Sequence, residues 1–503
     1  MLATIYTRAC LGVSAPLVTV EIHLSNGLPS LSIVGLPETG VKESKDRVRS
    51  ALLNSGFEFP AKRITINLAP ADLPKEGGRF DLPIALGILA ASAQIPVDAL
   101  HGYECLGELS LDGGLRPVRG VLPAVVAARA EGRALILPAA NGTEAALAAG
   151  EDVLATDHLL RVCEHLAGTA RIAPLAPRPV AEVVVHAPDL ADVRGQQVPR
   201  RALEIAAAGG HNLLFFGPPG TGKSMLASRL PGILPPLETE AALEVASVYS
   251  IAGEAPYANW HQPPFRAPHH TASAVALVGG GGNPRPGEIS LAHRGVLFLD
   301  ELPEFDRKVL EVLREPMESG HIVISRASRQ VTFPASFQVI AAMNPCPCGY
   351  RGHPKIDCQC TPQQVLRYQT KLSGPLLDRF DLHVEVPVQQ GEVLLNRHCQ
   401  SESSSRVRQR VAAARHRQLA RGSINAALTG SQLQRLCALD AASEALLTQA
   451  MERLGLSARA LHRVLRVART LADLDETGAV SQQHLVEALG YRQLDRPAFR
   501  GTP

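Results

Sequence analysis

The feature that most constrains this chain is a short glycine-rich loop at residues 217–224. It fits the G-x-x-x-x-G-K-[ST] phosphate-binding pattern at every required position, and its residues are Gly217, Pro218, Pro219, Gly220, Thr221, Gly222, Lys223 and Ser224. The apolar run at 213–216 predicts a buried strand before the loop, and residues 225–230 predict the start of a helix after it. In this context the pattern binds a nucleotide, so a chance glycine- and proline-rich surface loop is the weaker interpretation.

Each residue type in the loop has a chemical role. Glycines allow backbone N–H groups to turn inward around phosphate oxygens, and the N-terminus of the following helix adds the positive end of its dipole. We expect Lys223 to reach the β- and γ-phosphates and the Ser224 hydroxyl to be a ligand of Mg²⁺. The loop therefore predicts a nucleoside triphosphate and Mg²⁺ as cofactors.

A second apolar segment, residues 295–299, predicts a strand that ends in two carboxylates, Asp300 and Glu301. We expect Asp300 to hold Mg²⁺, directly or through water, and Glu301 to activate the attacking water as general base. An acidic pair at a strand end is a weak signal alone. Downstream of Lys223, it completes a site that both binds and hydrolyses the nucleotide.

Length, charge and cysteine content limit the remaining functions. The 503 residues suffice for about three domains of roughly 100–200 residues each. The formal net charge is only +2, so any DNA binding must come from local basic patches. The first residues contain no export signal, and the longest weakly polar run, 82–96, is too short to span a bilayer. With nine cysteines, we expect a cytoplasmic protein with reduced thiols and no membrane association.

Apolar periodicity predicts an α/β multidomain chain. Residues 1–168 form an α+β domain whose strand patterns lie at 17–24 and 64–68 and whose helical patterns lie at 41–55, 83–93 and 118–129. A proline- and alanine-rich linker is expected at 169–187. A P-loop α/β domain follows at 188–388 and an all-α lid at 389–503.

Two local basic segments are candidates for contact with DNA. Strand patterns at 321–325 and 330–333 flank a short turn, which predicts a β-hairpin with Arg326 and Arg329 at its tip. A few such arginines repeated around a ring would bind DNA phosphates in a salt-dependent way, and a solvated tip is the alternative. Residues 406–421 contain six arginines and no acidic residue. A solvated helix face and a contact with DNA or another subunit both fit that pattern.

Four cysteines form two C-x-C pairs separated by nine residues: Cys346 and Cys348, then Cys358 and Cys360. Four thiolates this close in sequence can complete a tetrahedral Zn²⁺ site, with His353 as a spare ligand. The C-x-C spacing is less typical of zinc than C-x₂-C, so reduced thiols without metal are the alternative. The other five cysteines are isolated, which is typical of small core residues.

Three further segments resemble a known family. Residues 265–271 are Phe-Arg-Ala-Pro-His-His-Thr, residues 284–293 are Pro-Arg-Pro-Gly-Glu-Ile-Ser-Leu-Ala-His, and residues 344–349 are Asn-Pro-Cys-Pro-Cys-Gly. Together with the phosphate-binding loop, they resemble the magnesium-chelatase-like AAA+ ATPases. When the front domain is included, nearly the whole chain is similar to the ComM/YifB branch of that family.

The resemblance implies further residues at an ATP site. The adenine would lie beside the segment 193–196, which contains Val193 and Arg194. The other implied roles are a first sensor that orients water at Asn344, an arginine finger that reaches into the neighbouring subunit at Arg379, and a second sensor on the lid at Arg459. A surface salt bridge is the ordinary alternative for any single arginine.

The front domain resembles the proteolytic domain of the Lon family, which has the ribosomal S5 domain 2-like fold. Residues 74–83 and 107–120 carry this resemblance. The nucleophilic serine and the lysine of that family would fall near Arg79 and Leu122, and neither residue type is present there. Because a Ser–Lys dyad needs both groups, we expect a proteolytically inactive domain used for assembly or for guiding a substrate.

The resemblance as a whole implies a hexameric, ATP-hydrolysing DNA motor. Such a helicase or branch-migration translocase would act in homologous recombination during natural transformation. Its expected partners are single-stranded and branched DNA in the ring pore, other copies of the chain, and recombinase proteins. The alternative is an ATP-dependent protein-remodelling subunit of a metal chelatase or chaperone complex. The front domain and the cysteine cluster favour the DNA motor, since chelatase motor subunits typically lack that front domain.

Overall fold

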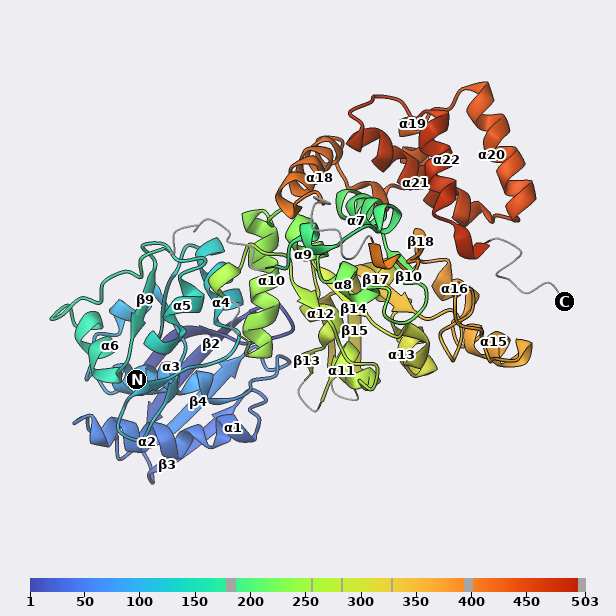
Figure 1. The fold of residues 1–503 in the computed structure, drawn as a ribbon. Helices are drawn as coiled ribbons and strands as arrows, with labels where there is room; N and C mark the ends of the chain where they lie inside the picture. The colour runs from blue at the N-terminus through green and yellow to red at the C-terminus, as the bar shows by residue number, and fades with distance from the viewer. Residues whose placement is uncertain (178–186, 255–256, 282–283, 327–328, 393–400, 496–503) are drawn as a thin grey trace.

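The computed structural model describes the chain at residues 1–177, 187–254, 257–281, 284–326, 329–392 and 401–495. Figure 1 shows three parts in chain order: a front domain around a seven-stranded sheet, a motor domain around a five-stranded sheet, and a helical lid. Within these described ranges, no helix has both the length and the apolar character needed to cross a membrane.

The front domain is built on a mixed sheet. Its strands lie in the order β3 (Ser30–Val34), β4 (Arg63–Ala69), β2 (Leu17–Ser25), β1 (Leu2–Arg8), β5 (Tyr103–Cys105), β8 (Ala134–Pro138) and β9 (Val153–Thr156). The pairs β1–β2 and β2–β4 are antiparallel, and the other neighbours are parallel. Residues of β2 alternate between buried and more exposed, as the period of two in its sequence predicts.

Helices cover this sheet. They are α1 (Thr39–Lys42), α2 (Ser44–Asn54), α3 (Asp81–Ala91), α4 (Val121–Ala130), α5 (Gly142–Ala145) and α6 (Leu159–Leu166), and a small ladder joins β6 (Glu108–Leu109) to β7 (Leu115–Arg116). Every residue of α3 is buried, which explains its unbroken apolar sequence. The helix expected at 118–129 begins only at Val121, because Gly120 adopts a left-handed conformation with φ of 65°.

The motor domain contains an all-parallel sheet in the order β11 (Phe265–Arg266), β14 (Val296–Leu299), β17 (Gln338–Met343), β10 (Leu213–Phe216) and β18 (Leu382–Glu385). All residues of β10 and β14 are buried, as expected for strands of a parallel sheet that is covered on both faces. The carboxyl ends of parallel strands lie at one edge, so the loops that follow β10, β14 and β17 meet there.

The helices and hairpins of the motor domain surround that sheet (Figure 1). The helices are α7 (Gln197–Gly209), α8 (Lys223–Ala227), α9 (Leu230–Ile233), α10 (Thr239–Ala252), α11 (Ala274–Val278), α12 (Glu288–Leu291), α13 (Arg307–Val312), α14 (Pro316–Ser319), α15 (Pro362–Gln369) and α16 (Gly374–Leu377). Two antiparallel pairs lie outside the main sheet: β12 (Gly279–Gly280) with β13 (Arg285–Pro286), and β15 (His321–Arg326) with β16 (Arg329–Pro334).

The lid consists of α18 (Ser404–Leu419), α19 (Gly430–Leu436), α20 (Ala441–Leu454), α21 (Ala458–Leu474) and α22 (Gln482–Gly490). Its core is continuous with that of the motor domain, because α18 and α21 pack against α7. The chain then returns to the sheet, where Arg492 forms a bridge with His383 of β18. Lid and motor are therefore joined by shared apolar burial as well as by the polypeptide.

The arginine-rich helix α18 contacts its own chain. Arg410 pairs with Glu204 at 2.6 Å, Arg415 donates to the Ala207 carbonyl at 2.9 Å, and Arg421 pairs with Asp473 at 2.5 Å. Neither interpretation of this basic segment, a solvated face or a contact with DNA or a second subunit, included such docking. Much of its positive charge is used to hold the lid on α7 and α21.

The front domain and the motor domain share an apolar interface. Helices α4 and α10 pack together in a cluster that also contains Tyr257 and Trp260. The Ser250 hydroxyl on α10 donates to the buried carboxylate of Glu144 in the front domain. The first residues of the expected linker belong to this domain, because the Leu175 N–H donates to the Val153 carbonyl of β9 at 2.7 Å. Residues 178–186 of that linker lie outside the described chain.

Candidate functional site

The phosphate-binding loop joins β10 to α8 at the carboxyl edge of the motor sheet. Gly217 has a φ of 154°, and a Cβ there would lie 2.4 Å from the Val386 carbonyl oxygen, so only glycine fits. The Thr221 hydroxyl donates to the Pro218 carbonyl at 3.0 Å and closes the loop. The loop therefore has the strand–loop–helix context that its sequence predicts.

Lys223 is buried and has no carboxylate hydrogen-bond partner. Its ammonium group donates to the Gly217 and Pro218 carbonyls, each at 2.7 Å, and to the Asn344 side-chain oxygen at 3.1 Å. Burial lowers the pKa of Lys223 to about 8, against the opposing effect of Asp300 and Glu301. A bound phosphate would provide the negative charge that this ammonium group lacks.

Asp300 and Ser224, the two expected Mg²⁺ ligands, are adjacent. The Ser224 hydroxyl donates to an Asp300 carboxylate oxygen at 2.6 Å, and the Glu301 N–H donates to the other oxygen at 2.9 Å. A hydroxyl and a carboxylate beside a phosphate site are the few oxygen ligands that Mg²⁺ takes from such proteins, so these residues fit the ion. Glu301 has a φ of 52°, a backbone strain of roughly 1–3 kcal/mol that is common at functional sites.

The structure adds His270, to which the sequence alone assigned no role. Its Nδ1 lies 3.3 Å from a Glu301 carboxylate oxygen, and its ring packs on His269 and, edge-on, on Phe305. A histidine in this position can orient the carboxylate of a general base. The signal was present in the segment 265–271, but nothing in the local sequence links it to Glu301, 31 positions from His270.

The segment expected beside adenine contacts the phosphate-binding loop. The Gln196 amide donates to the Thr221 carbonyl at 3.2 Å and to the Pro387 carbonyl at 2.9 Å. Val193 is buried, and its carbonyl accepts a hydrogen bond from Ser401 at 2.8 Å. Arg194 is exposed. The segment thus connects the loop to the beginning of the lid.

Arg379 lies at the opposite edge of the same sheet. Asn212, which directly precedes β10, donates to the Arg379 carbonyl at 3.0 Å, whereas the phosphate-binding loop follows the end of β10. The Arg379 side chain is buried and pairs with Glu318 at 2.6 Å. The structure therefore does not bring Arg379 to the phosphate-binding loop of its own chain.

Arg459 is grouped with Arg379. Arg463, one helical turn further along α21, pairs with Asp381 at 2.8 Å and donates to the Arg379 carbonyl at 3.3 Å. Burial is the main cause of the lowered pKa of Arg379, and the charges of Arg314, Arg459 and Arg463 lower it further. Four arginines thus gather at this edge, away from the nucleotide loop of the same chain.

The four cysteines of the C-x-C pairs come together. The Sγ atoms of Cys346, Cys348 and Cys358 lie 3.4–3.6 Å apart, and all four Sγ atoms are within 4.8 Å of one another. Zn–S bonds of about 2.3 Å place tetrahedral sulfurs roughly 3.8 Å apart, so the cluster fits a zinc ion. His353, the spare ligand candidate, instead accepts the backbone N–H groups of Lys355 and Ile356.

The cysteine cluster adjoins the nucleotide site. It follows Asn344 directly in the chain, and a Cβ on Gly349 would lie 2.8 Å from the Pro219 ring. The hairpin β15–β16 ends in the backbone pair Arg326–Arg329. The side chains of those two arginines, and residues 327–328 between them, lie outside the described part of the chain.

A parallel sheet with this loop, two carboxylates and an amide at one edge defines a P-loop nucleoside triphosphatase. Comparison with protein families extends that assignment. Residues 189–394 match the family described as magnesium chelatase, subunit ChlI, residues 20–141 match subunit ChlI of Mg-chelatase, and residues 401–492 match the ChlI C-terminal family.

Individual relatives match over nearly the whole chain. The competence protein ComM of Haemophilus influenzae is 54% identical over 502 residues, and the YifB protein of Salmonella typhimurium is 53% identical over 498, each covering 98% of both chains. The magnesium-chelatase 67 kDa subunit of Heliobacterium mobile is 28% identical over 196 residues, 33% of this chain and 29% of that one. The chain belongs to the ComM/YifB family of magnesium-chelatase-like AAA+ proteins, which implies an ATPase that uses Mg²⁺.

The lowered pKa of Lys223 predicts a pH dependence of nucleotide binding. Phosphates bind the protonated ammonium, and with a pKa of about 8 in the free site the neutral amine accumulates as the pH rises. We expect the Kd for Mg·ATP to rise about tenfold between pH 7 and pH 9. Binding titrations across this range provide the measurement. Lys223→Arg, whose guanidinium stays protonated, should give a flat profile, and equal slopes in both proteins would contradict the assignment.

Proposed function

We propose that this chain is the subunit of a hexameric ring that hydrolyses ATP and moves single-stranded or branched DNA through its pore. The observation that carries the proposal is the position of Arg379. Its backbone is bonded to the start of β10, and the phosphate-binding loop leaves the other end of that strand. A guanidinium there acts on a γ-phosphate only when a second chain brings its own loop to it.

The residues at the carboxyl edge divide the work of hydrolysis. Bound Mg²⁺ supplies positive charge to the phosphates. Lys223 binds the β- and γ-phosphates, while Ser224 and Asp300 provide the oxygen ligands. Glu301 accepts a proton from the attacking water, and His270, 3.3 Å away, holds its carboxylate in position. Asn344, within 3.1 Å of the Lys223 ammonium, lies where it can orient that water.

The DNA contact is assigned to the hairpin β15–β16. Its stem is anchored, because Ile322, Ile324, Val331 and Phe333 are buried in the motor core. The backbone pair Arg326–Arg329 lies at the far end from that anchor. Two arginines per chain, repeated around a ring, supply strong phosphate binding although the net charge of one chain is +2.

The relatives suggest the process. A protein named for competence, ComM of Haemophilus influenzae, matches this chain over 98% of its length. Uptake of external DNA ends in recombination, where a ring motor can drive branch migration and extend the incoming strand. Recombinase proteins are the partners we expect in that setting.

We also assign Zn²⁺ to the cysteine cluster. All four thiols converge, and the cluster lies between the proposed sensor Asn344 and the loop residue Pro219. A closed Cys₄ site has no open coordination position, so its role would be structural. It would hold the segment after β17 against the phosphate-binding loop.

The hairpin predicts a selective loss of DNA response. We expect Arg326→Ala/Arg329→Ala to reduce DNA-stimulated ATPase about tenfold or more and to lower the salt slope of DNA binding by about two, with unchanged affinity for ATP. ATPase assays with and without branched DNA, together with branch-migration assays, provide the measurement. The control, Arg161→Ala/Arg453→Ala, removes the same charge from two exposed sites.

Two results would count against this reading. Unchanged DNA binding in the hairpin variant would remove the hairpin from the DNA path. An ATPase that no DNA stimulates at low salt would contradict the DNA motor and favour the protein-remodelling alternative.

The position of Arg379 predicts complementation between inactive chains. Lys223→Ala removes the phosphate-binding lysine, and Arg379→Ala removes the finger, so each protein alone should lose about 10³-fold or more in kcat. Mixed rings should regain ATPase, because some intact loops then face an intact Arg379 on a neighbour. Activity is measured across mixing ratios, with exposed Arg367→Ala as the control that stays active alone. No regain in rings shown to be mixed would mean that Arg379 acts within its own chain.

The cysteine cluster predicts stoichiometric zinc. Elemental analysis of the purified chain should give about one Zn²⁺ per chain, lost in Cys346→Ser/Cys358→Ser. Cys437→Ser is the matched control, because this isolated thiol only donates to the Leu465 carbonyl. A full zinc content in the double variant, or none in the unmodified chain, would contradict the assignment.

A further inference from the structure

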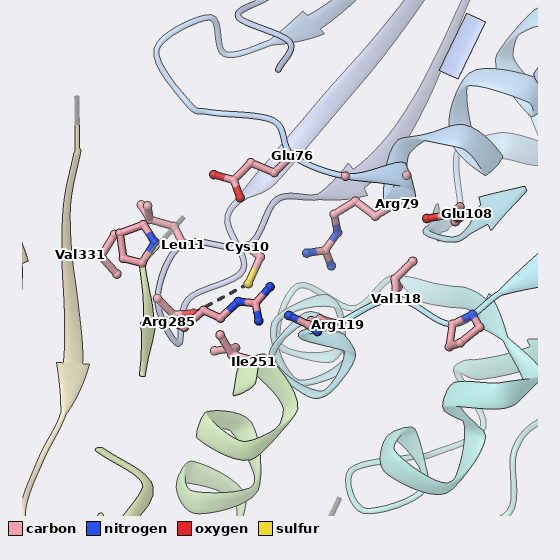
Figure 2. A pocket seen from close by; sticks show the side chains of 15 residues that line it. Cys10, Leu11, Glu76, Arg79, Glu108, Val118, Arg119, Ile251, Arg285 and Val331 are labelled. Carbon is pink, nitrogen blue, oxygen red and sulfur yellow. Dashed lines mark hydrogen bonds between the residues drawn. The ribbon is translucent and has the colours of Figure 1, made fainter. Parts of the chain in front are cut away.

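A cavity of about 340 Å³ lies where the front domain meets the motor domain. Figure 2 shows its lining, which comes from the loops around Cys10, Arg79 and Arg119 in the front domain and from Ile251, Arg285 and Val331 in the motor domain. The cavity is separate from the nucleotide site, since none of its lining residues belongs to the phosphate-binding loop. Its size is that of a small-molecule site.

Arg79 gives this cavity its chemical character. Its side chain is 94% buried by the remaining exposure of 6%, and neither Nε nor Nη2 has a hydrogen-bond partner. Its neighbours are the Cys10 thiol and, at longer range, Glu144. The Glu144 oxygens are already bonded to the Leu122 N–H, Ser250 and Asn141. A buried guanidinium with open donors is costly unless an anion completes it.

Two more guanidinium groups reach the same cavity. Arg119 extends from the loop before α4, and Arg285 extends from β13 (Figure 2). Both are exposed, so they remain available to an incoming group. The carboxylates of Glu76 and Glu108 also line the cavity, and Glu108 is directed in part to Arg116 at 3.8 Å. Positive groups outnumber negative ones, and the deepest of them is positive.

We propose that this cavity binds a small phosphorylated anion, with Arg79 as its buried anchor and Arg119 and Arg285 as its outer clamp. Planar guanidinium groups match phosphate oxygens through paired, charge-assisted hydrogen bonds. The enclosed volume favours a free phosphorylated molecule over a polymer strand. The inference does not depend on the proposed DNA motor.

The occupant would touch the segments that join the two domains to the hairpin. Gly12 packs on the hairpin strand β16, where a Cβ would lie 2.8 Å from the Thr332 carbonyl oxygen. Val331 of the same strand lines the cavity, as does Ile251 at the end of α10. Binding would therefore fix the front domain, α10 and the base of the hairpin relative to one another.

The test titrates the full chain with inorganic phosphate and, separately, with AMP, after the nucleotide site is saturated with Mg·AMP-PNP. Calorimetry and thermal melting provide the readouts. We expect saturable binding that falls about tenfold or more in Arg79→Met and is weakened in Arg119→Met and in Arg285→Met. Arg161→Met, which removes an exposed arginine of α6, should bind as the unmodified chain does.

Folding of the variants is controlled within the same experiment. Without ligand, Arg79→Met should melt at or above the temperature of the unmodified chain, because it removes an uncompensated buried charge. If it melts lower, the two exposed variants carry the test. No saturable binding of phosphate or AMP, or binding that all three variants retain, would overturn the proposal. Variants that weaken only the binding of a single-stranded oligonucleotide would assign the cavity to a DNA path and overturn it as well.

Discussion

The parallel pairing of β10, β14 and β17 is the constraint on which the rest of the motor depends. Phe216 pairs with Met343, and Leu299 pairs with Ala341, so the three strands end nearly level. Neighbouring strands are about 4.8 Å apart, which brings the residues after them within reach of one bound phosphate group. The Ser224–Asp300 and Lys223–Asn344 hydrogen bonds are consequences of that register. A slip by one residue would turn these side chains away from each other.

The same sheet explains why a single chain is incomplete. One edge carries the groups that bind and hydrolyse a nucleotide, and the other edge carries Arg379 with Arg459 and Arg463 beside it. Since β10 separates the two edges, no rotation of one side chain can bring them together. The lid reinforces this arrangement, because α21 is bound to the arginine edge through Arg463 and Asp381 and shares its core with α7. A change of lid position would therefore be felt first at the edge that faces a neighbour.

Much of the nucleotide site could be predicted from the sequence because its residues end strands or begin helices. Lys223, Asp300 and Asn344 each lie next to an apolar run whose direction is evident locally. His270 could not be predicted, because its contact with Glu301 exists only after β11 and β14 pair. The same reason applies to α18, where six arginines suggest a free basic face until Glu204 and Asp473 arrive from other segments. Of the front domain, the sequence predicts the α+β character but not the cavity that Arg79 shares with the motor.

Buried cations in this chain fall into two groups that burial alone does not distinguish. Arg8 pairs with Glu104 at 2.7 Å, and Arg469 pairs with Asp473 at 2.9 Å, so each charge is compensated within the fold. Lys223 and Arg79 are also buried, but no carboxylate accepts a hydrogen bond from either. An uncompensated charge lowers the stability of the empty protein, and an anion that binds there restores it. At Lys223 the adjoining loop shows that the missing anion is a phosphate. The guanidinium of Arg79 has the same deficit, in a cavity that two further arginines line, and the same physical reasoning assigns it an anion of its own.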